Sequence, residues 1–486
     1  MGDGQGLAGG YEGGGNGRGE GKRMRQGRPR GHWRDIALLV VAALAAATLT
    51  AAAYWPGLMT WDPVRQYGEA LGGDIDDWHP PAMQWLWARL LALHPGPAPM
   101  LVLQLALYWG GLVLIAAAGR GRPRLGWALL ACGLLPLGLA LTGAILKDCL
   151  MAGALLVATG LLAWLDERPA IGRRVLAAAL LLAAATLRFN AFAACLPLLV
   201  ALLPRQWRSR WPRLLLAAAL ATAALTAAMP LANRLIGAKP SGVELSLVLF
   251  DLGGITEHSG VDVFPPQLDV DDPVAVNHRC YSPNKWDTYS DWVDPECPLG
   301  FSAWNDAVAP AGVKPYRWWL GAIAAHPVAW GEHRLAHFAV NTRLLPLADA
   351  MERPVPITPA PNPWGFRIAP GPLLAGIDAL AVATAHTPLG WPIVWMALAL
   401  GTLLLARGGP AQGLAVPLAL SSLFYGGGYL VFSVASELRY HLWTELAALI
   451  ATVLLLADGR RLPRRRIALA YLPTVLVTLA CVATRL

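Results

Sequence analysis

Long apolar runs separated by short, arginine-rich connectors fill most of the chain from residue 36 onwards. A helix rises ~1.5 Å per residue, so most of these runs are long enough to cross a hydrocarbon layer ~30 Å thick. The pattern predicts an all-α polytopic membrane protein with about 11 transmembrane helices. The predicted helices cover residues 36–54, 99–118, 125–141, 149–165, 175–187, 191–203, 214–236, 389–406, 414–432, 442–457 and 467–483.

Arginine clusters in the connectors predict the orientation of these helices. The clusters lie at 120–124, 168–174, 205–213 and 460–466, and so fall on alternate connectors. Because Lys and Arg concentrate in cytoplasmic loops, the N-terminus is predicted to be inside, and loops 56–98 and 238–388 and the C-terminus outside. A further span at 372–386 would move the last cluster outside, so we interpret that segment as an interfacial or re-entrant helix.

Four regions follow from this pattern. Residues 1–34 are rich in Gly and Arg and have little to bury, which predicts a disordered, basic cytoplasmic tail. Residues 35–237 form an N-terminal transmembrane module, 238–388 a large outer loop, and 389–486 the C-terminal transmembrane helices. Within the loop, 316–345 is predicted to form helices on the membrane surface, with Trp318, Trp319 and Trp330 at the headgroup level. We expect this loop to close a cavity from outside; a simple cap is the alternative.

Composition agrees with a membrane protein. The chain is 56% hydrophobic and only 14% charged, and its mean hydropathy is +0.45, which is too apolar for a soluble protein. The formal charge of +8 lies in clusters that the positive-inside rule explains, so we expect membrane lipids and no nucleic acid as partners, in a bacterial-type inner (plasma) membrane. Of six cysteines, only Cys280 and Cys297 lie in the large outer loop, where an oxidising compartment predicts a disulfide between them.

The first outer loop concentrates ionisable and aromatic residues beside the membrane. The stretch from Trp61 to Ala70 contains Asp62 and Gln66, and the stretch from Asp74 to Pro81 contains Asp77, Trp78 and His79. Such a density of ionisable groups beside a bilayer indicates a functional site.

Three cations on the outer side break the positive-inside pattern. They are Lys147, Arg188 and Arg439, each at the outer edge of a predicted span. Any one of them would serve as a headgroup anchor. Together they favour an anionic ligand at the outer leaflet, because Lys and Arg hold phosphate by charge-assisted hydrogen bonds.

These motifs resemble the GT-C superfamily of polytopic glycosyltransferases, and in particular its mannosyltransferase-like and aminoarabinose-transferase-like families. The resemblance covers 36–203 and 433–457, and it rests on Asp62 after the first helix, His79-Pro80-Pro81, Lys147-Asp148 and Arg439-Tyr440. It implies a polyprenyl-phosphate sugar donor and a glycan, lipid or protein acceptor that enters from the extracytoplasmic side. Residues 238–388 match no pattern of the family.

The resemblance also implies roles for individual residues. Asp62 takes the place of the catalytic base, although Pro63 stands where these enzymes more often have Glu; an N-cap of a local helix is the alternative. His79 is expected to orient the acceptor or a carboxylate, and Asp148 either acts in catalysis or pairs with Lys147. The expected phosphate ligands are Lys147, Arg188, Arg439 and Tyr440, and the expected acceptor or sugar contacts are Gln66, Asp77 and Trp78, with Trp85 and Trp87 as further stacking faces.

Other functions stay open at this point. We predict no cofactor, and a divalent metal on Asp76, Asp77 and His79 is the alternative. His258, Glu257 and His441 are further, weaker candidates for the site. A lipid-linked sugar transporter or flippase usually has repeated halves and midplane charges, whereas here the ionisable groups gather at one face. A polysaccharide polymerase shares the many spans and large outer loop, but it leaves the motif after the first span unexplained.

Overall fold

The computed structural model describes residues 31–486 apart from 120–121, 166–170, 294, 347–353, 407–412 and 458–462. Within these ranges every regular element is helical, and β-pairing is limited to isolated bridges. The predicted all-α class is therefore confirmed for the described chain. Most of the predicted tail, residues 1–30, lies outside the described residues, as do parts of three of the arginine clusters.

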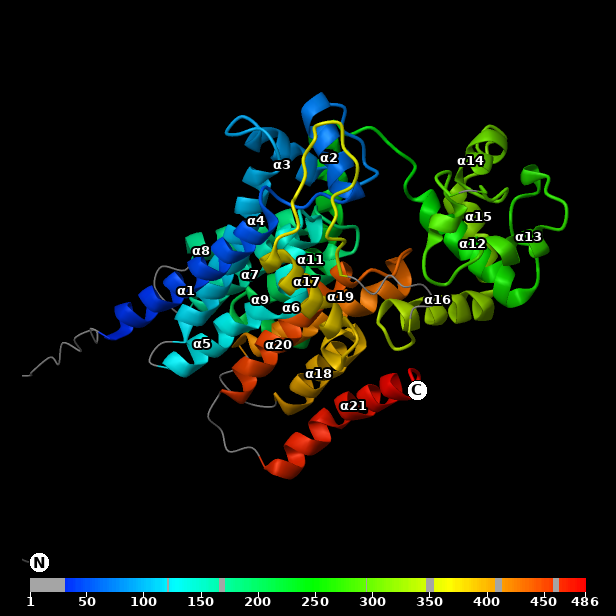
Figure 1. Ribbon diagram of the computed structural model, residues 1–486. Helices are drawn as coiled ribbons and strands as arrows, with labels where there is room; N and C mark the ends of the chain where they lie inside the picture. Colours follow the sequence, from blue (N-terminus) through cyan, green and yellow to red (C-terminus); the bar gives the residue numbers. More distant parts are fainter. Residues whose placement is uncertain are drawn as a thin grey trace, which may run out of the picture.

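The helices form an N-terminal bundle, an outer lobe and a C-terminal set (Figure 1). The bundle contains α1 (Gly31–Tyr54), α2 (Trp61–Gly72), α3 (Ala82–Leu90), α4 (Ala98–Ala118), α5 (Pro123–Ala131), η1 (Cys132–Leu134), α6 (Pro136–Gly143), α7 (Lys147–Ala163), α8 (Ile171–Ala185), α9 (Ala191–Ala201), α10 (Arg205–Arg208) and α11 (Trp211–Ile236). The lobe contains α12 (Leu245–Ser259), η2 (Pro266–Leu268), α13 (Pro273–Cys280), η3 (Trp286–Tyr289), α14 (Phe301–Ala303), η4 (Trp304–Val308), α15 (Pro315–Ala325) and α16 (Pro327–Asn341). The C-terminal set contains α17 (Pro372–Ala385), η5 (Pro388–Gly390), α18 (Pro392–Leu405), α19 (Ala415–Phe432), η7 (Leu438–His441), α20 (Leu442–Leu456) and α21 (Arg464–Ala483).

Six helical segments of the described chain are long and apolar enough to cross a membrane, which indicates an integral membrane protein. They are α1, α4, α11, α19, the joined η7 and α20, and α21. A seventh is obtained if the segments on either side of Leu135, which are bent by 58°, count as one span. The other predicted spans are helical but shorter, so the count of about 11 stays a prediction.

Apolar side chains on the outside of the bundle agree with this assignment. Leu216 and Leu220 on α11, and Leu476 and Leu479 on α21, are all more than half exposed. A soluble protein rarely leaves such continuous apolar faces open to water. We therefore place lipid against α11 and α21, while α4, α7 and α20 form the interior.

Small residues let α4 and α7 approach closely in that interior. A Cβ added to Gly111 would lie 2.7 Å from the backbone carbonyl carbon of Leu156, and one added to Gly160 would lie 2.5 Å from Cβ of Leu114. Close backbone approach through glycine is a common basis of helix packing in membranes, where apolar burial between helices contributes little.

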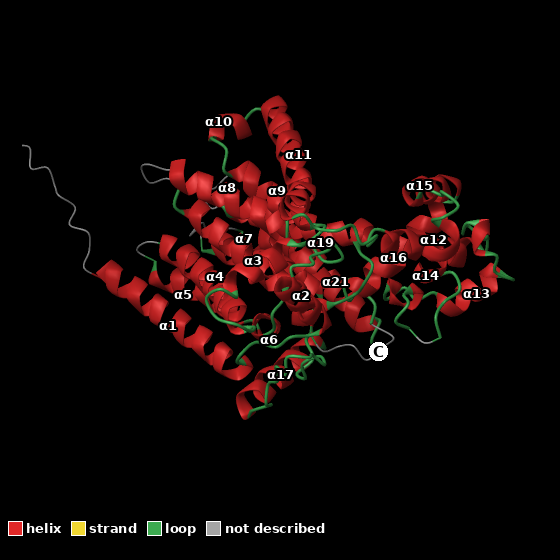
Figure 2. Ribbon diagram, turned by 90° about the horizontal axis from the view of Figure 1, so that it is seen from above, coloured by secondary structure: helices red, strands yellow, loops and turns green. Residues whose placement is uncertain are grey.

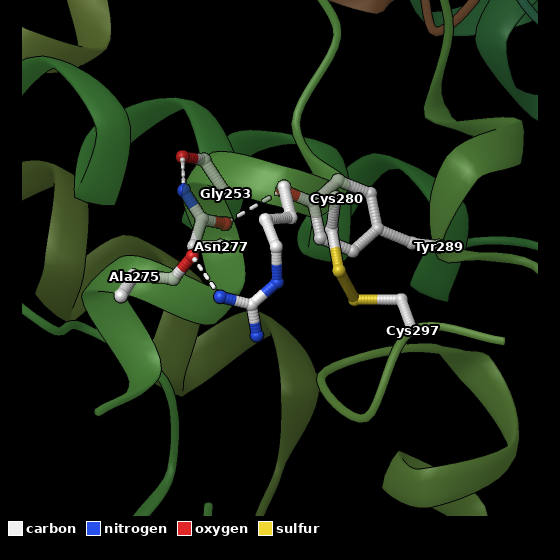
Figure 3. Close-up of a disulfide and its surroundings, with 7 residues drawn as sticks. Gly253, Ala275, Asn277, Cys280, Tyr289 and Cys297 are labelled. Atoms are coloured by element: carbon white, nitrogen blue, oxygen red, sulfur yellow. Dashed lines mark hydrogen bonds between the residues drawn. A yellow bond between two sulfur atoms is a disulfide. The ribbon is translucent and has the colours of Figure 1, made fainter. Parts of the chain in front are cut away.

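The outer lobe lies to one side of the bundle in both views (Figures 1 and 2). It has its own apolar core and contains the predicted disulfide between Cys280 and Cys297. Figure 3 shows Asn277 beside this disulfide, donating to the carbonyl of Gly253 and accepting from the hydroxyl of Tyr289. The disulfide therefore closes a part of the lobe that buried hydrogen bonds also fix.

The predicted surface helices of the lobe are α15 and α16, with a break between them at His326-Pro327. Their tryptophans have hydrogen-bond partners in the lobe. Trp319 and Trp330 donate their indole N–H groups to the buried carboxylate of Asp251, and Trp318 donates to the carbonyl of Val263. The indole N–H groups are therefore satisfied inside the lobe, and their position at the headgroup level stays a prediction.

After the lobe, the chain returns across the first outer loop. Ala360 donates its N–H to the carbonyl of Met59, and the rings of Trp364 and Phe366 meet the ring of Tyr67 on α2 edge to face. Figure 1 shows this yellow segment beside α2. The polar region 238–388 is thus a lobe followed by a returning strap, defined as residues 354–371, and the strap covers α2.

The contact between α4 and α7 generates a stability prediction with a neighbouring control. Gly111→Ala places a methyl group against the backbone of α7, and we expect it to lower the free energy of unfolding by ~1–3 kcal/mol. Gly110→Ala meets no atom within 4 Å, so helix propensity makes it neutral or slightly stabilising. Unfolding of both variants from mild detergent by SDS titration measures the difference. Equal stability of the two variants would contradict the close packing.

Candidate functional site

Asp62 lies in the first turn of α2. The helix begins two residues earlier than the N-cap interpretation requires, because Thr60 occupies the N-cap position, where it makes no side-chain capping bond. The alternative that Asp62 caps the helix is therefore wrong. Its side chain leaves the helix and reaches cations from distant parts of the chain.

Two of the predicted cations share one oxygen of Asp62. Lys147 Nζ, at the start of α7, and Arg439 Nη1, on η7, each lie 3.0 Å from Asp62 Oδ2. The Asp62 side chain keeps 24% of its surface exposed, whereas Lys147 and Arg439 keep 10% each. A single, partly accessible carboxylate thus joins the first outer loop to α7 in the bundle and to η7 in the C-terminal set.

Burial alone would raise the pKa of the Asp62 carboxyl, but Arg439 and Lys147 more than offset this and hold the pKa well below its usual range. The carboxylate is therefore ionised at any physiological pH. The same cations that stabilise its charge make it a weak proton acceptor while they remain in contact with it.

His79 completes this cluster from the loop before α3. Its Nδ1 lies 3.1 Å from Lys147 Nζ, and its Nε2 lies 3.8 Å from Asp62 Oδ1. An ammonium group only donates, so Nδ1 accepts and the ring proton sits on Nε2, facing Asp62. Burial and the nearby Lys147 lower the pKa of His79 to about 3, so the imidazole is neutral.

The other predicted residues form a second pair directly beside the first. Arg188, in the turn between α8 and α9, pairs with the buried carboxylate of Asp148. Its guanidinium carbon lies 4.1 Å from the ring centroid of Tyr440, and Arg439 lies 5.5 Å from the same ring. The ring of Tyr440 therefore joins the two ion-pair groups. Asp148 pairs with Arg188, and the alternative that it pairs with Lys147 is wrong.

All three predicted phosphate-binding cations are already paired with carboxylates. Arg439 contacts Glu437 as well as Asp62, with Nη2 2.9 Å from Glu437 Oε1. Glu437 was missing from the residues predicted to form the site, although it lies two positions before Arg439. An anionic ligand would therefore have to exchange with these carboxylates. Asp62, the partner of Lys147, is more exposed than Asp148, the partner of Arg188.

The predicted acceptor contacts lie around this cluster. Gln66, one helical turn after Asp62, donates to Gln84, which in turn donates to Glu69. Asp77 Oδ1 accepts from the N–H and the hydroxyl of Ser241, so it fastens the first loop to the start of the outer region.

The tryptophans of the first loop have different environments. Trp78 packs against Trp286, Trp292 and Phe301 of the lobe. Trp85 is 43% exposed, whereas Trp87 is fully buried and offers no face for a sugar. The prediction that Trp87 stacks on a sugar is therefore wrong.

The alternative of a metal on Asp76, Asp77 and His79 does not fit the geometry. Asp76 Oδ2 pairs with Arg65, Asp77 holds Ser241, and His79 faces Lys147, so the three side chains point to separate partners. No group of three or more His, Cys, Asp or Glu side chains in the described ranges is placed to share a metal ion.

The lobe fixes the backbone that leads into Arg439. Arg334 donates to the carbonyl of Ser433 at 2.6 Å, and Asn341 donates to the carbonyl of Ala435 at 2.8 Å. Asn341 Oδ1 also lies 2.7 Å from Nε2 of His441, just after Arg439 and Tyr440. Sequence patterns gave no signal for Asn341, because its partners lie about 100 residues away. His258 and Glu257, in contrast, face other lobe residues.

A double-mutant cycle tests this link between the lobe and η7. Asn341→Ala and His441→Ala each remove one partner of a buried hydrogen bond, so we expect a coupling free energy of ~1 kcal/mol in SDS unfolding. The control pair Asn341→Ala with Gly110→Ala shares no contact and should be additive within ~0.5 kcal/mol. Additivity in both cycles would contradict the link.

Comparisons with known proteins gave no match. No protein-family model, curated protein or solved structure matches the chain, so a functional assignment rests on the contacts described above.

Proposed function

We propose that this protein is a membrane glycosyltransferase that moves a sugar from a polyprenyl-phosphate donor to a glycan, lipid or protein acceptor at the outer face of the membrane. The observation that carries the proposal is the single carboxylate of Asp62, which lies between Lys147 and Arg439 at hydrogen-bond distance. A partly exposed acid between two largely buried cations offers both a proton acceptor and positive charge for a leaving phosphate.

In the proposed reaction, an acceptor hydroxyl attacks the anomeric carbon of the donor sugar. The bond from this carbon to the phosphate oxygen breaks, its electron pair leaves with the polyprenyl phosphate, and the hydroxyl proton passes to Asp62. Lys147 and Arg439 stabilise the charge that develops on the phosphate. Arg188 stabilises the same charge from beside Tyr440.

Donor binding would also activate the base. In the free protein, Lys147 and Arg439 hold the pKa of Asp62 well below its usual range, so it accepts protons poorly. A donor phosphate that takes over these cations relieves the carboxylate of their charge, and its proton affinity rises. His79 then orients Asp62 through Nε2–H, because its neutral ring donates on that side. Coupling of this kind confines proton transfer to the loaded enzyme.

One observation favours a lipid-linked sugar transporter or flippase as a second candidate. Glu445 lies one turn into α20, is only 2% exposed, and its Oε1 has no hydrogen-bond partner among the described residues. Carboxyl groups buried in spanning helices often belong to proton pathways. A transport role predicts that Glu445→Gln abolishes movement of lipid-linked sugar in vesicles, whereas sugar transfer in detergent should not depend on that proton path.

The proposed chemistry is tested by Asp62→Asn in the purified protein. The assay follows transfer of labelled sugar from polyprenyl-phosphate donors, identified by mass spectrometry of envelope glycans and lipid-linked sugars from cells with and without the gene. We expect turnover to fall by ~10² or more, because the amide cannot accept the proton. Asp74→Asn is the control, since Asp74 lies in the same loop, is 69% exposed and pairs only with Lys239 among the described residues. Normal turnover in folded Asp62→Asn protein would contradict the role of Asp62.

Activation by the donor predicts a difference between two pH profiles. The acidic limb of kcat/KM for the donor reports the free enzyme, where the pKa of Asp62 is well below its usual range. The acidic limb of kcat reports the enzyme with bound donor. We expect this limb at higher pH, because the donor phosphate then holds the cations that lower the pKa of Asp62 in the free enzyme. Steady-state kinetics between pH 3 and 8 at saturating acceptor measures both limbs. Coincident limbs would contradict the exchange of Asp62 for phosphate.

A further inference from the structure

A groove lies at the end of α20 opposite to Arg439. The first two turns of α5 and the last turn of α20 border an open volume of about 680 Å³. This size falls within the range of small-molecule sites, ~300–1,000 Å³. Its apolar walls come from Leu125 and Ala128 on α5 and from Val453 and Leu456 on α20. No residue of the Asp62 cluster lines it, so the groove is separate from the proposed catalytic site.

Positive charge gathers at one end of these apolar walls. Arg122 and Arg124 both line the groove, and both are exposed. Arg122 Nη1 donates to the carbonyl of Ala457 at 3.0 Å and so satisfies the end of α20. The side chain of Arg124 has no ion-pair or hydrogen-bond partner among the described residues. The groove also meets the N-terminal turn of α5, whose helix dipole adds partial positive charge.

We propose that this groove binds an anionic phospholipid from the membrane leaflet at that end of the bundle. The phosphate contacts Arg124 and Arg122, and an acyl chain lies along Leu125, Ala128, Val453 and Leu456. A lipid fits better than a soluble anion, because the apolar walls would stay exposed to water around a free phosphate. An anionic lipid fits better than a zwitterionic one, because none of the described residues that line the groove is a carboxylate that would balance the arginines.

The positive-inside pattern assigns this end of the bundle to the cytoplasmic side, since Arg122 and Arg124 belong to one of the predicted cytoplasmic clusters. Anionic lipids attract basic residues close to that membrane surface. The site requires only that the protein is embedded in a membrane. It does not depend on glycosyl transfer.

Native mass spectrometry of the full chain in detergent tests the proposal. The protein is titrated with phosphatidylglycerol and phosphatidylcholine that have the same acyl chains. We expect phosphatidylglycerol to bind at least fivefold more tightly, and Arg124→Gln to remove most of this preference. Ala128→Phe fills the apolar part of the groove without changing charge, so it should weaken binding of both lipids. Arg213→Gln removes an exposed arginine at the start of α11, outside the groove, and should leave the preference unchanged.

Several results would overturn the proposal. Two results would show that the arginines do not distinguish the lipid headgroups. One is equal binding of the two lipids by the unaltered protein, and the other is an unchanged preference for phosphatidylglycerol in Arg124→Gln. Displacement of bound lipid by millimolar inorganic phosphate would identify a soluble-anion site. A dimer that Ala128→Phe dissociates would identify a second copy of the chain as the occupant. Arg124→Gln changes an exposed side chain, so its result stands even if Ala128→Phe fails to fold.

Discussion

The ion pair that Asp62 shares with Lys147 and Arg439 connects the parts of this protein that matter for its proposed chemistry. It joins the first outer loop to the start of α7 and to η7, which are far apart in the sequence. Buried cations are costly unless they are paired, so neither Lys147 nor Arg439 would be stable in its position without a carboxylate. Any ligand that takes these cations must therefore bring its own negative charge.

Much of the surrounding structure serves to hold this arrangement in place. The returning strap packs Trp364 and Phe366 on Tyr67 and so fixes α2, which carries Asp62. The lobe reaches the other side of the cluster through Arg334 and Asn341, which bind the backbone just before Arg439. A lobe beside the bundle thus positions a cation of the cluster, and closure of a cavity by loop 238–388 stays a prediction.

The sequence patterns were sufficient for the long apolar helices and for the main members of the cluster. Apolar runs predict these helices, because membrane helices need continuous apolar surface. They did not predict the 58° bend at Leu135 within the run 125–141. Cations on the outer side predict Lys147, Arg188 and Arg439, because they break the positive-inside rule. The partners of these cations did not follow from the sequence. Neighbouring residues on a helix point in directions about 100° apart, so Lys147 and Asp148 take different partners despite their adjacency.

Long-range hydrogen bonds explain the remaining differences. Asn341 has no motif of its own, and its role depends on how the lobe meets the segment before η7. The tryptophans of α15 and α16 have the composition of a membrane-surface helix. The buried carboxylate of Asp251, which pairs with Arg334 through its other oxygen, nevertheless accepts two of their indole N–H groups, since buried polar groups need hydrogen-bond partners.

The central claim is that a lipid phosphate replaces Asp62 between Lys147 and Arg439. The most direct test is the affinity of the purified protein for a polyprenyl phosphate and for the matching polyprenol, in nanodiscs of zwitterionic lipid. The account predicts that the phosphate binds at least about tenfold more tightly, because charge-assisted hydrogen bonds to it replace those to Asp62. It also predicts that Lys147→Gln removes most of this difference. Equal affinities for the two lipids, or an unchanged difference in Lys147→Gln, would contradict it.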